Sequence, residues 1–269
     1  MFKVFSKFFN DKDFFEIFQK GGISFLIRIG GQVMGFLMSL VVAYKYGAQG
    51  LGSFVLAITV LRIFTLLAKL GLDTTSVRFI ASFAKQDKWQ NIILFRRKII
   101  LLICITSVIS SITMYFLSSS ISSIIDVKRQ YLQIASFFVL PMTFFILHYQ
   151  SLKGLKRIAE FSFFYRMSQT TFTIISIYII SIFVKDDIVP VYAYLSALII
   201  VSLLSYFTYR FSFFKIKKVN PEEVIEDLKF KNILKISIPL LFAQSVQFIM
   251  AWTDKLMIGN MMDAERVAI

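Results

Sequence analysis

The sequence predicts an all-α polytopic membrane protein, and two observations lead to that prediction. Of the 269 residues, 57% are hydrophobic and only 17% are charged, whereas soluble domains average about 45–50% and about 25%. A water-facing globule of this length could not bury that excess. The apolar residues also form long continuous runs, which the short alternating strands of a barrel would not give. A soluble enzyme, a disordered chain and a disulfide scaffold are therefore excluded.

Seven runs are long enough to cross a hydrocarbon core of about 30 Å as helices. Six of them form one transporter-like lobe over residues 23–209, and the seventh opens an incomplete second lobe over 236–269. Residues 1–22 are expected to form a cytoplasmic amphipathic N-terminus, and residues 210–235 a cytoplasmic linker helix. The predicted spans are Ile23–Tyr44, Phe54–Leu72, Ile99–Leu117, Tyr131–Leu152, Phe161–Val184, Val189–Tyr209 and Ile236–Ile258.

The distribution of basic residues predicts the orientation. Twenty of the 30 Lys and Arg residues fall on the side of the N-terminus, five on the other side and five within spans. Cytoplasmic loops carry the excess of positive charge, so the N-terminus and both long connections, Asp73–Lys98 and Arg210–Lys235, are predicted to be cytoplasmic. The net charge of +14 is then a topology signal, and no nucleic-acid partner is expected.

The two cytoplasmic segments outside the spans have different patterns. In the first twenty residues, Phe recurs among polar residues, which suits an interfacial amphipathic helix, although an unstructured leader fits as well. The acidic residues in this segment, and the apolar run after it that is long enough to span the membrane, do not suit a cleaved signal peptide. In the linker, Asn220 and Pro221 can begin a helix, with Glu222 and Glu223 at its positive end. Val224, Ile225, Leu228 and Leu234 give that helix one apolar face.

Basic residues within the predicted spans are functional candidates, because an ionisable group at membrane depth is costly. Arg62 lies about 15 Å from the cytoplasmic end of its span, near the bilayer midplane. Lys69 and Arg166 lie nearer the surface and could instead extend to the headgroups, as could Arg28. The first six spans contain no Asp or Glu, and Asp254 in span seven lies beside Lys255.

A cation without an acidic partner is tolerated where it faces a water-filled cavity. Such a cavity would be electropositive and would suit a phosphate, which Arg binds through two hydrogen bonds. The residues expected to bind an anionic diphosphate in the cavity are Arg28, Arg62, Lys69 and Arg166. The polar residues expected to line it are Gln32, Gln244 and Gln247.

Three other features are interpreted as structural. His148, the single histidine, is expected to pack rather than to relay protons. Pro141 removes a backbone donor and should bend its helix. Three small residues in span one should let another helix approach closely; they are Gly30, Gly31 and Gly35.

Span seven can be superposed on span one at an offset of 212 residues, which predicts a parallel internal repeat. The matched pairs are Gln32 with Gln244, Phe36 with Phe248, Met38 with Met250, and Gly47 with Gly259.

Short motifs rich in Gly and basic residues occur at the ends of the spans. They are Arg28-x-x-Gly31, Lys45-Tyr46-Gly47, Gly50-Leu51-Gly52-Ser53-Phe54, Leu70-Gly71-Leu72-Asp73, Arg78-Phe79-Ile80-Ala81, Leu152-Lys153-Gly154-Leu155-Lys156-Arg157 and Ile238-Pro239-Leu240. Together they resemble the polysaccharide-biosynthesis flippases of the multidrug/oligosaccharidyl-lipid/polysaccharide exporter superfamily, which includes O-antigen transporters. The resemblance covers essentially the whole chain.

The resemblance implies two six-helix lobes around a central cavity in the bacterial inner membrane. It implies that the protein flips an undecaprenyl-diphosphate-linked oligosaccharide by alternating access, for O-antigen, capsule or another surface polysaccharide. The implied partners are that lipid-linked oligosaccharide, membrane lipids and polysaccharide polymerase or assembly proteins. Because the chain holds one lobe and one further helix, it is expected to be an N-terminal fragment of such a transporter.

Three alternatives remain open. A cation-coupled multidrug antiporter of the same superfamily would need membrane carboxylates, which the first six spans lack. A membrane enzyme is disfavoured by the single histidine and by the lack of a sizeable extramembrane domain. A truncated chain could also serve as a non-transporting membrane scaffold. No catalytic residue, metal site or cofactor is expected.

Overall fold

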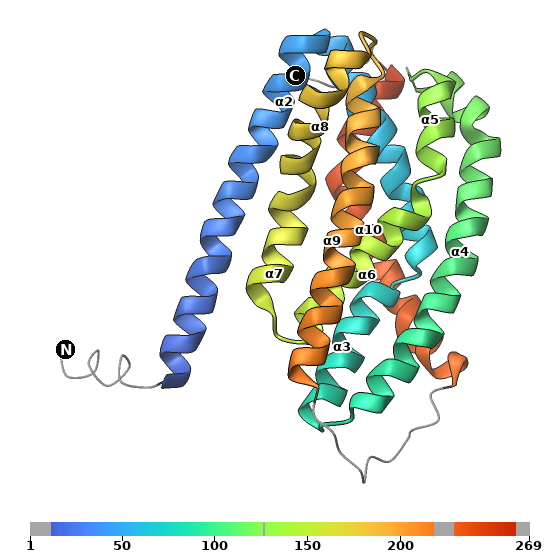
Figure 1. Cartoon of the computed structure of the whole chain (residues 1–269). Helices are drawn as coiled ribbons and strands as arrows, with labels where there is room; N and C mark the ends of the chain where they lie inside the picture. Colours follow the sequence, from blue (N-terminus) through green and yellow to red (C-terminus); the bar gives the residue numbers. More distant parts are fainter. Residues whose placement is uncertain (1–11, 126, 218–228, 262–269) are drawn as a thin grey trace.

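The computed structural model describes residues 12–125, 127–217 and 229–261. Every regular element in these ranges is helical, which confirms the all-α prediction. Four of the described helices are long and apolar enough to cross a membrane by length and composition, or five if α5 and α6 form one bent span. The long helices run up and down the bundle side by side (Figure 1). The charge-based orientation stays a prediction.

Four of the seven predicted spans lie within one helix each, whereas Phe54–Leu72, Tyr131–Leu152 and Phe161–Val184 cross boundaries between helical elements. The elements are α2 (Lys12–Lys69), α3 (Leu72–Lys85), α4 (Trp89–Ile124), α5 (Arg129–Ser136), α6 (Val139–Gly154), α7 (Ile158–Phe163), the π-helical turn η1 (Phe164–Ser168), α8 (Gln169–Phe183), α9 (Val189–Ile216) and α10 (Phe230–Met261).

Helix α2 contains the first predicted span and most of the second, and it reverses direction between them. At Gly47 the backbone leaves the helical region, with φ 72° and ψ 178°. A residue with a Cβ rarely adopts this φ, so the glycine of the Lys45-Tyr46-Gly47 motif permits the reversal. Figure 1 shows the part of α2 before this turn at the edge of the bundle, and it packs on α7, η1 and α8.

The connection Asp73–Lys98 is not a loop, because the segment forms a helical hairpin packed into the bundle; its cytoplasmic location stays a prediction. Helix α3 covers its first half and buries Asp73, Ser76 and Ile80 against its neighbours. The remainder is the first part of α4, where Arg96 is buried although the sequence analysis counted it among loop charges. The amphipathic pattern of α3 places apolar and hydroxyl residues on one face, which makes burial favourable.

Pro141 bends its span, as predicted. Helices α5 and α6 meet at an angle of 52°. The break precedes Pro141 by the length of one helical turn, because the proline has no N–H for the carbonyl four residues earlier and its ring crowds that turn. The Ser202 hydroxyl on α9 donates a hydrogen bond to the Pro141 carbonyl at 3.4 Å.

Helices extend into both predicted cytoplasmic segments where the structure describes them. Helix α9 continues to Ile216 and α10 already begins at Phe230, so Leu234 belongs to α10 and not to the linker. At the N-terminus, α2 begins at Lys12 and continues into the first span without a break. Residues 1–11 and the linker residues Asn220, Pro221, Glu222, Glu223, Val224, Ile225 and Leu228 lie outside the described residues.

Close helix contacts hold the inner part of the bundle together. Gly154 at the end of α6 touches α3, since a Cβ there would lie 2.9 Å from the Ile80 Cβ. One turn earlier, the Ser151 and Ser76 hydroxyls lie 3.4 Å apart. The outer faces expose large apolar side chains, among them Phe116 at 76% and Phe183 at 82% exposure. Such continuous apolar surface suits a protein surrounded by lipid.

Candidate functional site

A cavity of about 400 Å³ brings together three of the cations predicted to bind an anion. Arg62 and Lys69 reach it from α2, and Arg166 reaches it from η1. Arg62 and Lys69 are seven residues apart, so two helical turns place them on the same face of α2. The other lining residues are Thr65, Leu66, Met142, Phe145, Ile146, Tyr149, Phe164, Tyr165, Gln169, Tyr194, Leu198 and Phe248.

The position of Arg166 depends on two features of the backbone. It lies in the five-residue π-helical turn η1, which widens the helix at the cavity. Gly31 of α2 lies directly against this turn, because a Cβ at Gly31 would stand 2.7 Å from the Arg166 carbonyl oxygen. The predicted close approach is therefore confirmed at Gly31, and the guanidinium lies 4.5 Å from the centre of the Tyr165 ring.

Aromatic side chains from α6 and η1 form the wall beside Arg166, and Phe161 of α7 packs against them. The Phe161 and Tyr165 rings stack with centroids 5.4 Å apart and an interplanar angle of 12°. Tyr149 packs against both, at 6.0 Å from Phe161 and 5.7 Å from Tyr165. This stacking restricts the rings of the wall, so the cations face a firm surface on one side.

Lys69 forms an ion pair with Asp73 at 2.7 Å, across the break between α2 and α3. The two side chains are only 14% and 3% exposed. The structure does not show Lys69 extended towards headgroups: its ammonium is held at the cavity by a carboxylate. That carboxylate was assigned to a cytoplasmic loop, although it lies four residues after Lys69.

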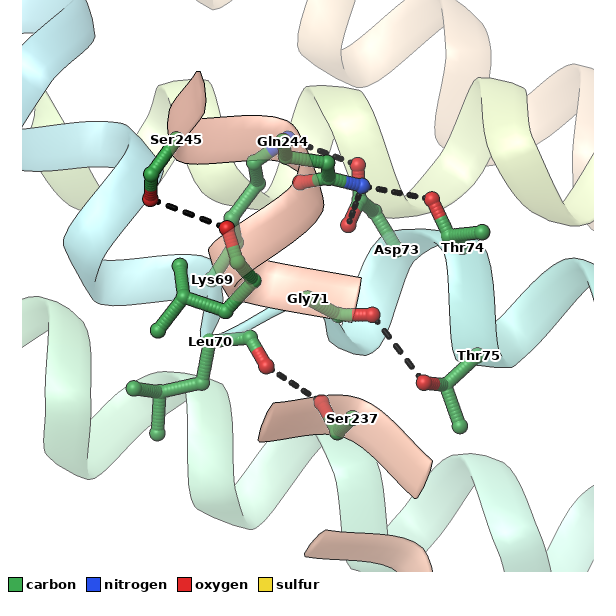
Figure 2. Close-up of polar contacts among 10 residues, drawn as sticks. Lys69, Leu70, Gly71, Asp73, Thr74, Thr75, Ser237, Gln244 and Ser245 are labelled. Atoms are coloured by element: carbon green, nitrogen blue, oxygen red, sulfur yellow. Dashed lines mark hydrogen bonds and ion pairs between the residues drawn. The ribbon is translucent and has the colours of Figure 1, made fainter. Parts of the chain in front are cut away.

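Figure 2 shows how α10 contacts this break. The Gln244 amide nitrogen donates hydrogen bonds to the Asp73 carboxylate, at 3.1 Å, and to the Thr74 hydroxyl. The Ser237 hydroxyl donates to the Leu70 carbonyl, one of those that the end of α2 leaves without an intrahelical partner. Gly71, with φ 72°, allows this contact, because a Cβ there would lie 2.4 Å from the Ser237 carbonyl oxygen.

The other predicted site residues do not line the cavity. Arg28 and Gln32 are exposed on the first part of α2, and Gln247 is exposed on α10. Gln244 lies behind the cavity wall and binds Asp73 rather than lining the cavity itself. The side chain of Lys255 lies outside the described residues.

Gln169 is a polar cavity residue that the sequence analysis missed. Its amide nitrogen donates to the Tyr194 carbonyl at 2.9 Å, and its buried Oε1 has no hydrogen-bond partner among the described residues. The signal was present in the sequence, because Gln169 follows Arg166 by three residues and so shares its helix face. Across the described part of the chain, no group of three or more His, Cys, Asp or Glu side chains could hold a metal ion.

The chemistry of the cavity favours a multivalent anion with an apolar attachment. Two guanidinium groups and one ammonium group line it, and one carboxylate lies just behind the wall. Guanidinium groups bind phosphate oxygens through paired hydrogen bonds, and limited contact with water strengthens this attraction. The rest of the lining is mostly aromatic and aliphatic, with Thr65 and Gln169 as further polar residues, and it suits the apolar part of such a ligand.

Comparison with known proteins gives one match. Residues 17–269 match the model of a protein family described as "Polysaccharide biosynthesis protein". No curated protein and no solved structure match the chain. The matched range includes every helix described above apart from the first residues of α2. The chain is therefore a multi-pass membrane protein that belongs to the polysaccharide biosynthesis protein family.

Proposed function

We propose that the protein is a flippase that moves an undecaprenyl-diphosphate-linked oligosaccharide across the bacterial inner membrane. The family supports a flippase-like transport role in polysaccharide biosynthesis. The observation that carries the more specific proposal is the gathering of Arg62, Lys69 and Arg166 around one cavity within the helical bundle. O-antigen, capsule and related surface polysaccharides are the products in whose synthesis such a step is needed.

The diphosphate would occupy the cavity between the three cations. Arg62 and Arg166 would each bind phosphate oxygens with two hydrogen bonds, while Lys69 would act as a compact positive charge. The polyprenyl tail would stay in the bilayer, because transferring its many methylene groups to water is unfavourable. Membrane lipids are then partners of the outer surface, and polysaccharide polymerase or assembly proteins would receive the flipped glycan.

A cation-coupled drug antiporter is the second candidate, and one observation favours it. Asp73 is a buried carboxylate beside the cavity, which the sequence analysis did not place there. A cationic drug would nevertheless meet Arg62, Arg166 and the ammonium of Lys69 before it reached Asp73, and like charges in a poorly hydrated site repel strongly. The cavity therefore suits an anion better than a cation.

Export of surface glycan tests the proposal. With the gene at its own locus, Arg62→Ala should lower export by at least about tenfold, a loss of transition-state binding of about 1.4 kcal/mol. Arg62→Lys should retain part of the activity, since a point charge still attracts diphosphate but loses the paired hydrogen bonds. Arg62→Glu should be the most damaging of the three variants, because it repels the diphosphate.

Lys45→Ala is the matched control, because it removes an exposed cation that does not line the cavity. Immunoblots of membrane fractions should show all four variants at native levels. Native export by both Arg62→Ala and Arg62→Glu would contradict the anion cavity. Drug resistance that depends on Asp73, with unchanged glycan export, would favour the antiporter instead.

A further inference from the structure

Lys69 has two roles in the geometry, because it lines the cavity and also neutralises Asp73. Its ammonium lies 2.7 Å from the Asp73 carboxylate. Arg62 and Arg166 line the same cavity, so an anion bound between them would compete with Asp73 for this ammonium. Phe248 of α10 also lines this cavity, but Lys69 is the lining residue whose ammonium pairs with the carboxylate of α3.

Asp73 depends on that partner more than an exposed carboxylate would. Its residue is 2% exposed, so little water can solvate its charge where it lies. A carboxylate that loses its cation in such a site must regain hydration or become very unfavourable. The group that covers it is Gln244 of α10, which donates to the Asp73 Oδ1 at 3.1 Å.

Helix α10 is attached at this place by few polar contacts. Gln244 binds Asp73 and Thr74, and Ser237 binds the Leu70 carbonyl. Beyond Gln244, α10 exposes Val246, Ile249 and Met250. An opening that hydrates Asp73 would have to loosen this stretch of α10, in which Ser237 is buried and Phe248 lines the cavity, from the break at Gly71.

We propose that Asp73 is a positioning residue that reports occupation of the cavity to α10. This inference rests on the proposed function. A bound diphosphate attracts the Lys69 ammonium away from Asp73, and the unpaired carboxylate then regains water by loosening the contact with Gln244. Helix α10 is thus held against α3 in the empty state and released when the anion binds.

The proposal gives Asp73 an effect on affinity that a merely structural residue would not have. Part of the binding free energy of the anion is used to separate Lys69 from Asp73 and to open the α10 contact. By linkage, a variant that does not have to separate Lys69 from a charged Asp73 binds the anion more tightly. In such a variant, anion binding no longer loosens the contact between α10 and α3. Asp73→Asn is such a variant, since an amide leaves no charge to be hydrated and can still accept from Gln244.

The test measures two quantities on the purified full chain in lipid nanodiscs, with inorganic pyrophosphate as the probe. Isothermal titration gives its affinity, and hydrogen–deuterium exchange reports the opening of peptides covering 70–76 and 234–245. In the native chain, pyrophosphate should speed exchange in both peptides at least about threefold. In Asp73→Asn, affinity should rise about three- to tenfold, and exchange should no longer respond to pyrophosphate.

Gln244→Leu provides a second variant that leaves both charges in place. It should raise exchange in the 234–245 peptide without pyrophosphate, because α10 has lost its donor to Asp73. Gln247→Leu is the matched control, an exposed glutamine one turn further along the same helix, and should exchange like the native chain. Should Asp73→Asn fail to fold, equal exchange in these two glutamine variants would overturn the proposal.

The outcomes separate this inference from the proposed function. Suppose that the native chain binds pyrophosphate and Arg62→Ala weakens it, but Asp73→Asn binds no more tightly or still responds in exchange. The cavity would then stand as an anion site, and the role of Asp73 would be disproved. A native chain that does not bind pyrophosphate would overturn both.

Discussion

Two buried basic groups in this bundle have opposite surroundings. At the cavity, Lys69 is paired with a carboxylate and has open volume beside it. On α4, Arg96 is only 8% exposed, and its guanidinium lies 3.7 Å from the centre of the Tyr209 ring. His148 lies on the neighbouring α6, with its ring 5.4 Å from Tyr206 and stacked on Phe144 at 6.0 Å. We call Arg96, His148, Tyr206 and Tyr209 the closed cluster.

The difference shows that burial of a cation does not by itself indicate a binding site. Lys69 has a partner that a ligand could replace and space for that ligand. Arg96 is stabilised by an aromatic face that no soluble anion can replace, and within the described residues no ion pair joins it to a carboxylate. The first arrangement can bind and release an anion, whereas the second holds α4 against α9.

The strongest test of this comparison is Arg96→Ala. Loss of a buried cation–π contact and of the packing of the long side chain should lower the free energy of unfolding by about 2–3 kcal/mol. Thermal unfolding in detergent measures this effect, and Arg62→Ala should stay within about 1 kcal/mol of the native chain because its side chain lines open volume. Equal destabilisation by the two variants would remove the distinction between cavity and closed cluster.

Gly71→Ala should produce the next largest effect, on the cavity side. The left-handed φ of 72° is unfavourable for alanine, and the new Cβ would meet the Ser237 carbonyl oxygen at 2.4 Å. We expect a destabilisation of about 2 kcal/mol, with faster hydrogen exchange in α10. Gly35→Ala is the control, since nothing lies within 4 Å of its added Cβ; a similar loss there would contradict a specific contact at Gly71.

Gly31→Ala should change binding more than stability. Its Cβ would lie 2.7 Å from the Arg166 carbonyl oxygen, so the turn that carries Arg166 must shift. We expect the affinity for pyrophosphate to fall about threefold, or about 0.7 kcal/mol, in the same titration. Gly30→Ala meets only the Met167 sulfur at 3.8 Å and should bind normally; reduced binding in both would point to a general disturbance of α2.

His148→Phe should have the smallest effect. A phenyl ring can keep the stacking on Phe144 and the contact with Tyr206, and the buried Nδ1 of His148 has no hydrogen-bond partner among the described residues to lose. The free energy of unfolding should change by less than about 1 kcal/mol, and glycan export should change by less than about twofold. A complete loss of export in a stably folded variant would give His148 a chemical role that packing does not explain.

The sequence was most informative where one residue or one run decides the structure. Continuous apolar runs located the helices, because each span must satisfy its backbone polar groups within itself. Pro141 predicted a bend for the same local reason. Arg62, Lys69 and Arg166 were recognisable because charge within an apolar run is costly wherever it lies, and all three line one cavity.

The sequence was least informative where tertiary contacts set the environment of a charge. Asp73 follows one apolar run and Arg96 precedes the next, so an assignment based on local hydropathy places both in a loop. Their burial depends on α3 folding back against α6 and on Tyr209 covering Arg96 from another helix. Arg28 is the opposite case. Its position in a predicted span indicated that it lines a cavity, whereas the fold leaves its side chain exposed on α2.

The π-helical turn at Phe164–Ser168 has a genetic consequence. A π-helical turn accommodates one more residue than the α-helical turn it replaces, so it can be regarded as an insertion within an otherwise regular helix. Deleting one residue there would let the turn return to the α-helical period, so the flanking segments would keep their relation while the widened turn itself would be lost. Arg166 lies within this turn and would leave its present position with no substitution there. The number of residues in this short stretch therefore constrains the site as well as their identities.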